Sequence, residues 1–585
     1  MKLCVGKAIE TLTDWRTLSF GGRPRVTFGV GSLRRDKLWY YRGPKWKSWV
    51  KLQFIVLMKN TWRMSWSTWS FRHFASRSSW FLLAAAISFG LWVGVVVPAF
   101  DLPFVSDDLA LLVEDSRNPW YLSLDRQYRL FRDGLNRLMF HSFGMNPRPY
   151  HIVAIATFLA CVVLLFLFIR NQGISTGCAA AAAALVLLYP RNASFLFAFE
   201  FSQETFMTCG AMLALLGWTA FRRTGSKLGY GAAFAGFAIA LGYKETGIMV
   251  PALLVGLDLY RVKSCKHSLL QREFWRPYAG LLPIILVYGA FVLWRPNGSL
   301  LNPSSDSTYK YSSVSGTVLA LARDLMNLSF PFSPMRALRD FRTWQYLAAA
   351  VEWISILGIA IWTDTLRNWI FATWWGFLVM LPPSMFARPV NSDRYMFLPM
   401  LGIAFALGAS ADVATRRLRL LAPALLIGAL LIYAAVSSQR LAEQRGDWAR
   451  AGDIVRRLVQ SLEVISPPQD AASLTLVNIP SQYRTAPILN NGLYGALLEA
   501  GYPWSLKLDF STPGQQDQEQ HALFERLLAC PVDSSLRSQS KILMWDADAW
   551  IDRTGMCGDM AVKHDQQLQP YVWRIVRDET VVSLQ

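Results

Sequence analysis

The chain alternates long apolar stretches with short polar ones between about residue 80 and residue 437. The apolar windows match the roughly 17 to 25 residues that a helix needs to cross the hydrocarbon core of a bilayer. They predict an all-α polytopic membrane protein of about eleven transmembrane helices. The interruption at 242–247 indicates short helices that are broken or tilted. The predicted spans are 80–100, 150–169, 176–190, 204–221, 228–242, 246–260, 278–294, 343–362, 369–384, 395–413 and 420–437.

Two other regions show different patterns. In LDRQYRLFRDGLNRLMFHSFG, within 101–149, apolar residues recur at helix-like intervals and predict an amphipathic helix at the membrane interface. In the tail, SLTLVNIP, KILMWDAD and YVWRIV are typical of short buried strands, and GLYGALLEAG and HALFERLL are typical of helices. We therefore predict three parts: a segment 1–79, a transmembrane domain 80–437 with a first external loop 101–149, and a small α/β domain 438–585.

The net charge of +19 matters through its distribution. Residues 1–79 carry 16 Lys+Arg against 3 Asp+Glu, and more arginines lie in short loops between spans. This positive-inside pattern places 1–79 in the cytoplasm, where it would bind anionic membrane lipids. Loop 101–149, the turns at 191–203 and Lys244, loops 295–342 and 385–394, and the tail then face the periplasm of a bacterial inner membrane. No motif indicates binding of nucleic acid.

Residues 1–57 lack the periodicity of the spans and the apolar core of a signal peptide. We expect them to be disordered, or not to be translated, because Met58 is followed by a more ordinary start. Cys530 and Cys557 are the two cysteines of the tail, and on the periplasmic side they could form a disulfide. No cysteine and histidine spacing indicates a zinc site.

Asp107 and Asp108, in VSDDLALL, open the first external loop. One interpretation is that they cap the helix that follows. The other is catalytic: an ionised carboxylate takes the proton of an acceptor hydroxyl, while its neighbour holds a metal or a sugar hydroxyl. Because crowded charge of one sign beside a bilayer is costly, we regard both aspartates as candidate catalytic residues.

Basic residues on the predicted external face form a second group of candidates. Lys244, in GYKETGIMVP, either makes an interfacial ion pair with Glu245 or contacts a phosphate as a point charge. In FARPVNSDRYMFLP, two arginines precede a span that Tyr395 opens. Since arginine favours bidentate recognition of phosphate, we predict a lipid-phosphate site formed by Arg394, Lys244, Arg388 and Tyr395.

Three further residues could orient an acceptor together with Glu245. Glu200 and Glu204, in FAFEFSQETF, are spaced as neighbours on one helix face, although solvated surface acids fit this pattern better. His151, in RPYHIVAIA, starts the second span, and a lone histidine there is more often packed than catalytic. No GxSxG, P-loop, GxGxxG or HExxH motif occurs in a supporting context, so we expect no cofactor.

These motifs together resemble a known family, the polyprenyl-phosphate-sugar-dependent integral membrane glycosyltransferases of the GT-C fold. The branch with most in common includes the transmembrane O-mannosyltransferases and bacterial relatives that lack their tetratricopeptide repeats. The matching positions are Asp107 and Asp108; Gly144, Asn146, Pro147, Tyr150 and His151; Lys244, Glu245 and Gly247; and Arg394, Tyr395, Leu398 and Pro399. The chain departs from the pattern at Asp393, where a glutamate is more usual, and in its tail, which has no repeats.

The resemblance implies direct, inverting transfer of a hexosyl or pentosyl group from a polyprenyl-phosphate donor to an envelope glycan, lipid or protein. Asp107 or Asp108 would be the base, and Arg394 and Lys244 would stabilise the leaving lipid phosphate. Family members with monophosphate donors generally need no metal, although the paired carboxylates leave a divalent ion open. Two alternatives are a transporter or flippase for lipid-linked saccharides, and a polymerase or ligase with the same donor.

Overall fold

The structure is a computed structural model. It describes residues 77–106, 108–109, 129–261, 272–293, 312–333, 338–385, 393–418, 421–464, 473–484, 486–489, 496, 506–509, 540–546, 549–552 and 568–577. Segment 1–57, the predicted tail helices apart from Ala496, and both tail cysteines lie outside these residues.

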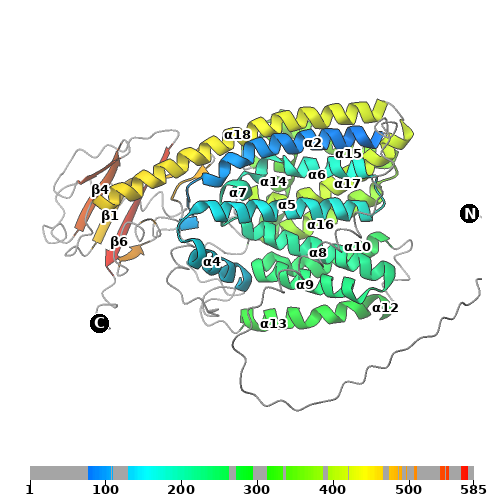
Figure 1. The fold of residues 1–585 in the computed structure, drawn as a ribbon, viewed down its shortest axis with the longest axis horizontal. Helices are drawn as coiled ribbons and strands as arrows, with labels where there is room; N and C mark the ends of the chain where they lie inside the picture. Colours follow the sequence, from blue (N-terminus) through cyan, green and yellow to red (C-terminus); the bar gives the residue numbers. More distant parts are fainter. Residues whose placement is uncertain are drawn as a thin grey trace, which may run out of the picture. The chain divides into compact units, whose positions relative to one another are not determined.

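Each predicted span coincides with a helix, and the described chain is an all-α bundle followed by a sheet (Figure 1). Five helices are long and apolar enough to cross a membrane, and a sixth is the pair α6 and α7, bent by 54°, if it counts as one span; these figures concern the described residues. The helices are α2 Arg77–Val96, α4 Leu130–Phe143, α5 Pro147–Asn171, α6 Thr176–Leu187, α7 Ala193–Phe197, α8 Ser202–Thr224, α9 Lys227–Tyr243, α10 Val250–Arg261, α12 Arg272–Trp275, α13 Leu282–Leu293, α14 Val314–Ser329, α15 Thr343–Trp362, α16 Leu366–Ser384, α17 Phe397–Arg417 and α18 Leu421–Val464. Short 3-10 turns connect them, among them η3 Val97–Asp101, η4 Pro190–Asn192, η5 Glu245–Met249, η6 Arg276–Leu281, η7 Leu338–Asp340 and η8 Asp393–Met396.

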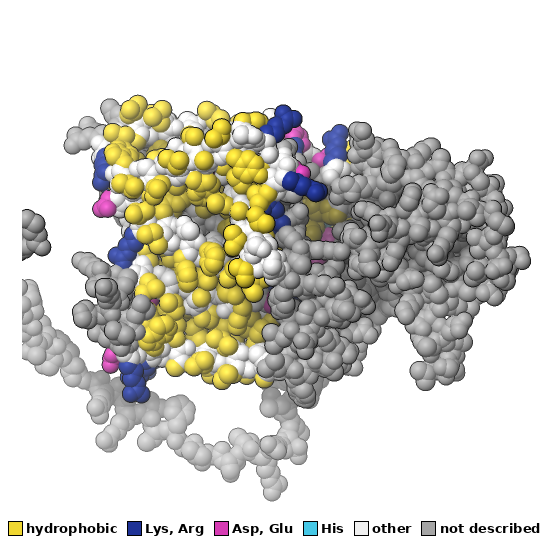
Figure 2. Space-filling model, turned by 180° about the vertical axis from the view of Figure 1, so that it is seen from behind, with side chains coloured by type: hydrophobic (Ala, Val, Ile, Leu, Met, Phe, Trp, Pro, Cys, Tyr) yellow, Lys and Arg dark blue, Asp and Glu magenta, His cyan; other side chains and the backbone are white. Residues whose placement is uncertain are grey.

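The surface of the bundle carries a broad band of hydrophobic side chains, bordered by Lys and Arg (Figure 2). Large apolar residues such as Leu286, Val351, Ile354 and Ile432 are more than 60% exposed. Exposed apolar surface of this extent is unfavourable in water and indicates contact with lipid. The protein is therefore a multi-pass membrane protein.

The two ends of the bundle differ in their charged residues. At one end Arg261 of α10 donates to Gln172, and the Ser175 backbone donates to Asp412 near the end of α17. The opposite end holds the first turn of α8, with Glu204, and the end of α9. At about 1.5 Å per residue, the 23 residues of α8 extend roughly 34 Å, which exceeds the hydrocarbon core of a bilayer.

Helices α8 and α9 form a hairpin whose backbones touch through glycine. A Cβ atom on Gly236 would lie 2.5 Å from the Gly210 carbonyl oxygen, and one on Gly217 would lie 2.6 Å from the Gly229 carbonyl oxygen. Both glycines of each helix are seven residues apart, so they share one face and allow close approach along its length. This packing fixes the end of α9 beside the start of α8.

We expect Gly236→Ala to lower the free energy of unfolding by about 1 to 3 kcal/mol, because the added methyl group overpacks the hairpin. Gly231→Ala is the matched control, because Gly231 lies on the same helix and a Cβ there would meet no atom within 4 Å. Thermal unfolding in detergent should show a lower midpoint for the first variant than for the second. Equal midpoints would contradict the close backbone contact.

Helix α18 is longer than the apolar pattern predicts. The predicted boundary at residue 438 falls inside it, and it continues to Val464 before the sheet starts at Ser473. Beyond 438 its buried face includes Leu441, Trp448 and Leu458. A Cβ on Gly452 would lie 2.8 Å from Pro103, so this part of α18 supports the segment that leads to the paired aspartates.

The tail forms a sheet that contains all three predicted strands. The order is β3-β6-β1-β4-β5, with β2 beside β1; β1 and β4 are parallel and the other pairs are antiparallel. The strands are β1 Ser473–Tyr483, β2 Ala486–Pro487, β3 Leu506–Asp509, β4 Ser540–Asp546, β5 Ala549–Asp552 and β6 Leu568–Arg577. The Ser106 amide donates to the Ile488 carbonyl oxygen at 2.7 Å, which joins this region to the segment that follows α2 and η3.

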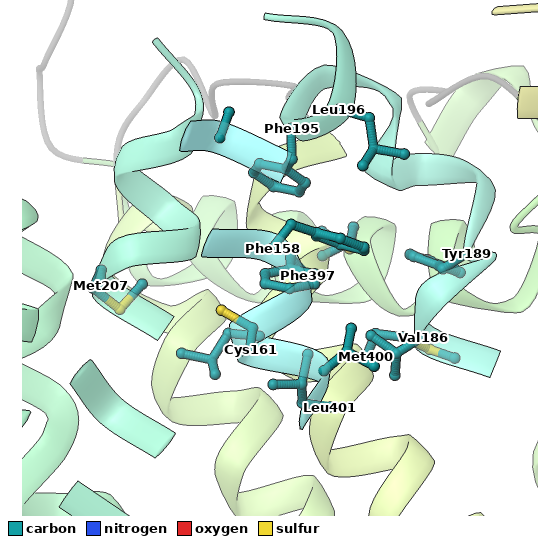
Figure 3. Close-up of a cluster of buried hydrophobic side chains, with 14 of the residues drawn as sticks. Phe158, Cys161, Val186, Tyr189, Phe195, Leu196, Met207, Phe397, Met400 and Leu401 are labelled. Carbon is teal, nitrogen blue, oxygen red and sulfur yellow. The ribbon is translucent and has the colours of Figure 1, made fainter. Parts of the chain in front are cut away.

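The core between α5, α6, α7, α8 and α17 consists of closely packed apolar side chains (Figure 3). Phe158 and Phe195 each pack against Phe397, with ring centroids 5.5 and 5.1 Å apart. Met207 and Phe397 also line a small cavity at the start of α8. The closely packed core therefore supports the charged residues at that end of the bundle.

Candidate functional site

A break between α9 and α10 places Lys244 inside the protein. Helix α9 ends at Tyr243, and Lys244 adopts an extended conformation (φ −154°, ψ 141°) before η5 begins. A Cβ on Gly247 would lie 2.5 Å from the Ala240 carbonyl carbon, so glycine is required where the turn folds back on α9. The break predicted near Gly242 is thus confirmed.

Lys244 and Arg394 contact the same buried carboxylate. The Lys244 Nζ donates to Glu204 Oε1, and the Arg394 Nε lies 3.5 Å from that oxygen. The side chains of Lys244 and Glu204 are 2% and 4% exposed. Tyr395 completes the group, since its ring centroid is 4.7 Å from Lys244 Nζ and 5.1 Å from the Arg394 guanidinium carbon. Cations over an aromatic face gain further stabilisation.

A small cavity lies beside these residues. Its volume is about 10 Å³, and Thr208 and Thr246 contribute to its lining together with the charged group. Among the described residues, Glu204 Oε2 and the Thr208 hydroxyl are buried without a hydrogen-bond partner. A volume of this size accommodates about one water molecule. The cavity is therefore too small in this conformation for a phosphate group.

Arg129 forms a second ion pair at the next turn. Its Nε and Nη2 donate to the two carboxylate oxygens of Glu245 at 2.9 and 2.8 Å, and its Nη1 donates to Gln203 at 2.6 Å. Arg129 directly precedes α4, and Phe131 of that helix packs against Gly242 of α9. The pair therefore fastens the amphipathic helix, which the sequence predicts and the structure confirms, to the α9–α10 turn.

The ion pair keeps Glu245 charged. Burial alone would raise the pKa of Glu245, but Arg129, aided by Lys244, lowers it from 4.5 to about 2. Burial would likewise lower the pKa of Arg129, yet Glu245, followed by Glu204 and Glu200, raises it. A carboxylate whose pKa is lowered to about 2 is a weak base, and both oxygens of Glu245 already accept from Arg129, so Glu245 holds Arg129 in place.

We expect Glu245→Gln to destabilise the protein by on the order of 2 kcal/mol at neutral pH. Because folding lowers the pKa of Glu245, its contribution is complete above pH 4.5 and is lost as the pH falls from 4.5 toward 2. Thermal unfolding of both proteins in detergent should give midpoints that converge across this range. Glu463→Gln, at an exposed position of α18, should show no such convergence, and a difference that persists at low pH would contradict the assignment.

Asp108 is buried and bonded to the segment before α8. Its Oδ1 accepts a hydrogen bond from the Glu200 backbone N–H at 2.7 Å, and its exposure is 1%. The contact joins Asp108 to Glu200, two residues that the sequence predicts on the same face of the membrane. Asp107 and Arg388 lie outside the described residues, so their roles stay predictions.

His151 is a packed residue in this structure. Its side chain is fully buried, and its Nε2 lies 3.0 Å from the Leu102 carbonyl oxygen. The neighbouring Tyr150 donates to the Gly144 carbonyl oxygen at 2.8 Å. These bonds hold the start of α5 against the segment leading to Asp108, which is a positioning role and the one that the sequence favours for a lone histidine.

Arg129, Gln203 and Arg191 are residues that the sequence does not single out. Arg191 donates to Asp393 at 2.6 Å and to the carbonyl oxygens of Asn327 and Phe330 at 3.0 and 2.9 Å. It thereby fixes η8, which carries Arg394, to the end of α14. The sequence offers one signal for Arg191: this arginine, in YPRN, follows a predicted span on the face opposite the positive-inside residues.

An open apolar groove is lined by residues that neighbour the charged group in the sequence. It has a volume of about 870 Å³ and is lined by α4, α5, α8 and α9. Phe206 and Tyr243 form part of its wall, with stacked rings 4.4 Å apart. They lie two residues from Glu204 and one residue from Lys244 in the sequence. The groove can therefore hold a long apolar chain.

No group of three or more His, Cys, Asp or Glu residues that could hold a metal occurs in the part of the chain that the structure describes. The positive charges facing the cavity come instead from Lys244 and Arg394. This end of the bundle thus has two cations at the cavity, Lys244 and Arg394, together with several carboxylates and an apolar groove. Such a combination suits an amphiphilic phosphate.

No protein-family model and no curated protein matches the chain. Among solved structures, it is similar to the crystal structure of ArnT from Cupriavidus metallidurans in the apo state, with a TM-score of 0.46 and 13% identity over 80% of this chain and 93% of that one. It is also similar to ArnT bound to undecaprenyl phosphate, with a TM-score of 0.47 and 13% identity over 85% and 98%. At this level of similarity, the chain's own residues have to carry any functional inference.

Proposed function

We propose that this protein is an integral membrane glycosyltransferase that uses a polyprenyl-phosphate-linked sugar. The transferred group would be a hexosyl or pentosyl residue, and the acceptor an envelope glycan, lipid or protein at the outer face of the bacterial inner membrane. One observation carries the proposal: Lys244 and Arg394 share a buried carboxylate, and an open apolar groove is lined by Tyr243 and Phe206, which neighbour Lys244 and Glu204 in the sequence. A phosphate attached to an isoprenoid chain needs both features together.

The groove suits the lipid part of such a donor. Its volume of about 870 Å³ falls within the range of roughly 300 to 1,000 Å³ for ligand sites. Its walls are apolar and include Leu135 and Leu138 of α4, so burial of prenyl units is favourable. The phosphate would then lie at the Tyr243 end, within reach of Lys244 and Arg394.

The proposed reaction is a direct displacement. The acceptor hydroxyl oxygen forms a bond to the anomeric carbon while the bond from that carbon to the phosphate oxygen breaks. The acceptor proton goes to a carboxylate, and the lipid phosphate leaves with the electron pair and an added negative charge. Lys244 and Arg394 stabilise that charge as it develops, which is where electrostatic catalysis has its largest effect.

We assign the general base to Asp107 and a positioning role to Asp108. The Asp108 Oδ1 already accepts a hydrogen bond from the Glu200 backbone N–H, so this bond fixes the orientation of the Asp108 side chain. Glu200 then stands beside the aspartates as the candidate for orienting the acceptor, whereas Glu245 is bound to Arg129. The proposal requires no metal, because two side-chain cations face the leaving phosphate.

Transfer from a radiolabelled polyprenyl-phosphate sugar tests the proposal. Purified protein in detergent, incubated with this donor and an envelope acceptor extract, is expected to move the label from the lipid to the acceptor fraction. A nucleotide sugar with the same label is the negative control. Transfer from the nucleotide sugar alone would refute the proposal, and movement of unaltered lipid-linked saccharide across a liposome bilayer would favour the transporter instead.

A further inference from the structure

Glu204 occupies the position that a bound phosphate would need. It lies in the first turn of α8, where its Oε1 accepts from Lys244 and is 3.5 Å from the Arg394 Nε. With the carboxylate in this place, the cavity beside the two cations has a volume of only about 10 Å³. A phosphate group, with four oxygens, cannot enter a space for about one water molecule.

The polar atoms around the cavity indicate that a ligand completes it. Glu204 Oε2 and the Thr208 hydroxyl both line it, and each is buried without a hydrogen-bond partner among the described residues. Thr208 is fully buried one turn after Glu204 on α8. Buried polar atoms left in this way cost free energy, and phosphate oxygens could accept from the Thr208 hydroxyl.

A carboxylate in this position also stabilises the unliganded protein. Two uncompensated cations in a buried site would be strongly unfavourable, whereas a paired arrangement is tolerated. The same carboxylate would repel a phosphate, because like charges brought together in a site of low dielectric oppose binding.

We infer that Glu204 is a displaceable counter-ion: it neutralises Lys244 and Arg394 in the empty protein and gives up this place to the phosphate of the ligand. The inference rests on the proposed function and adds to it that the site selects charged ligands over neutral ones. A ligand that brings its own negative charge replaces Glu204 at the cations. A neutral polyprenol fills the groove but leaves the ion pairs intact, so it is bound without access to the reactive position.

Binding of small analogues to the purified full-length protein tests the inference. The probes are geranylgeranyl monophosphate, inorganic phosphate and the neutral alcohol geranylgeraniol, each titrated while the unfolding midpoint is recorded. Glu204→Gln removes the competing charge at nearly constant volume. Glu204→Asp keeps the charge and shortens the side chain by one methylene, and it serves if the glutamine variant does not fold. Glu443→Gln, an exposed carboxylate paired with Arg440, is the control.

Glu204→Gln is expected to tighten the binding of the prenyl phosphate at least about tenfold, because a juxtaposed like charge is removed. Glu204→Asp should tighten it less, and Glu443→Gln and the alcohol should show no change. Unchanged or weaker binding of prenyl phosphate by both Glu204 variants would overturn the counter-ion role while leaving the proposed function intact. If no protein, wild type included, binds the prenyl phosphate, the proposed function itself fails. An equal gain with inorganic phosphate supports the counter-ion role but counts against a lipid donor.

Discussion

Lys244→Met is expected to lower kcat/KM for the lipid donor by about 10²- to 10³-fold, the usual effect of removing one group that stabilises transition-state charge. The variant loses a cation that faces the leaving phosphate. It also leaves Glu204 with a negative charge directed at the ligand, because Lys244 is the residue that pairs with Glu204 most closely. Initial rates of label transfer over a range of donor concentrations measure the effect.

The controls separate chemistry from folding. Removing one partner of a buried ion pair costs about 3 to 5 kcal/mol, so the unfolding midpoint of Lys244→Met should fall as well. The double variant Lys244→Met/Glu204→Gln should recover stability but not turnover. Lys227→Met, at the other end of α9, should match the wild type in both. Normal turnover in Lys244→Met would remove this lysine from the phosphate site.

Asp107→Asn is expected to lower kcat by about 10²- to 10⁴-fold, which is the usual contribution of a general base. Donor binding should stay close to that of the wild type, because the aspartate acts on the acceptor and not on the lipid phosphate. Separate titrations of donor binding and of transfer rate distinguish the two.

Asp108→Asn provides the matched comparison. An asparagine Oδ1 can still accept the Glu200 backbone N–H, as Asp108 does at 2.7 Å, so we expect a smaller loss of turnover. If Asp108→Asn alone abolishes transfer, the two roles are reversed. If both variants turn over normally, neither aspartate is the base.

The sequence predicts the membrane helices well because length and apolarity are local properties. Two elements show where this information ends. Helix α14 is missed because it combines exposed Val314 and Val318 with buried Arg323 and Asp324, so no apolar window marks it. The second half of α18 is missed because its pattern turns amphipathic after the span, and its buried face depends on contacts with residues such as Phe197.

The candidate site is predictable in its composition but not in its pairing. Lys244, Arg394 and Tyr395 stand out as polar residues next to apolar stretches, and the structure brings them together with Glu204. Which carboxylate meets which cation depends on helix packing, since Lys244 and Glu204 are 40 positions apart. Arg129 and Glu245 are 116 positions apart. Such pairs are set by the way α4 packs against the α8–α9 hairpin. No local sequence pattern describes this packing.

The contacts of Pro103 and Ser106 set an order in which the protein can mature. Pro103 packs on Gly452, and the Ser106 amide donates to Ile488. Both partners are synthesised more than 340 residues after the segment that they support. Because chains fold from the N-terminus as they emerge from the ribosome, the transmembrane helices are inserted while this segment still lacks its backing. We therefore expect the segment before the aspartates to reach its final packing only after the chain has been synthesised as far as Ile488.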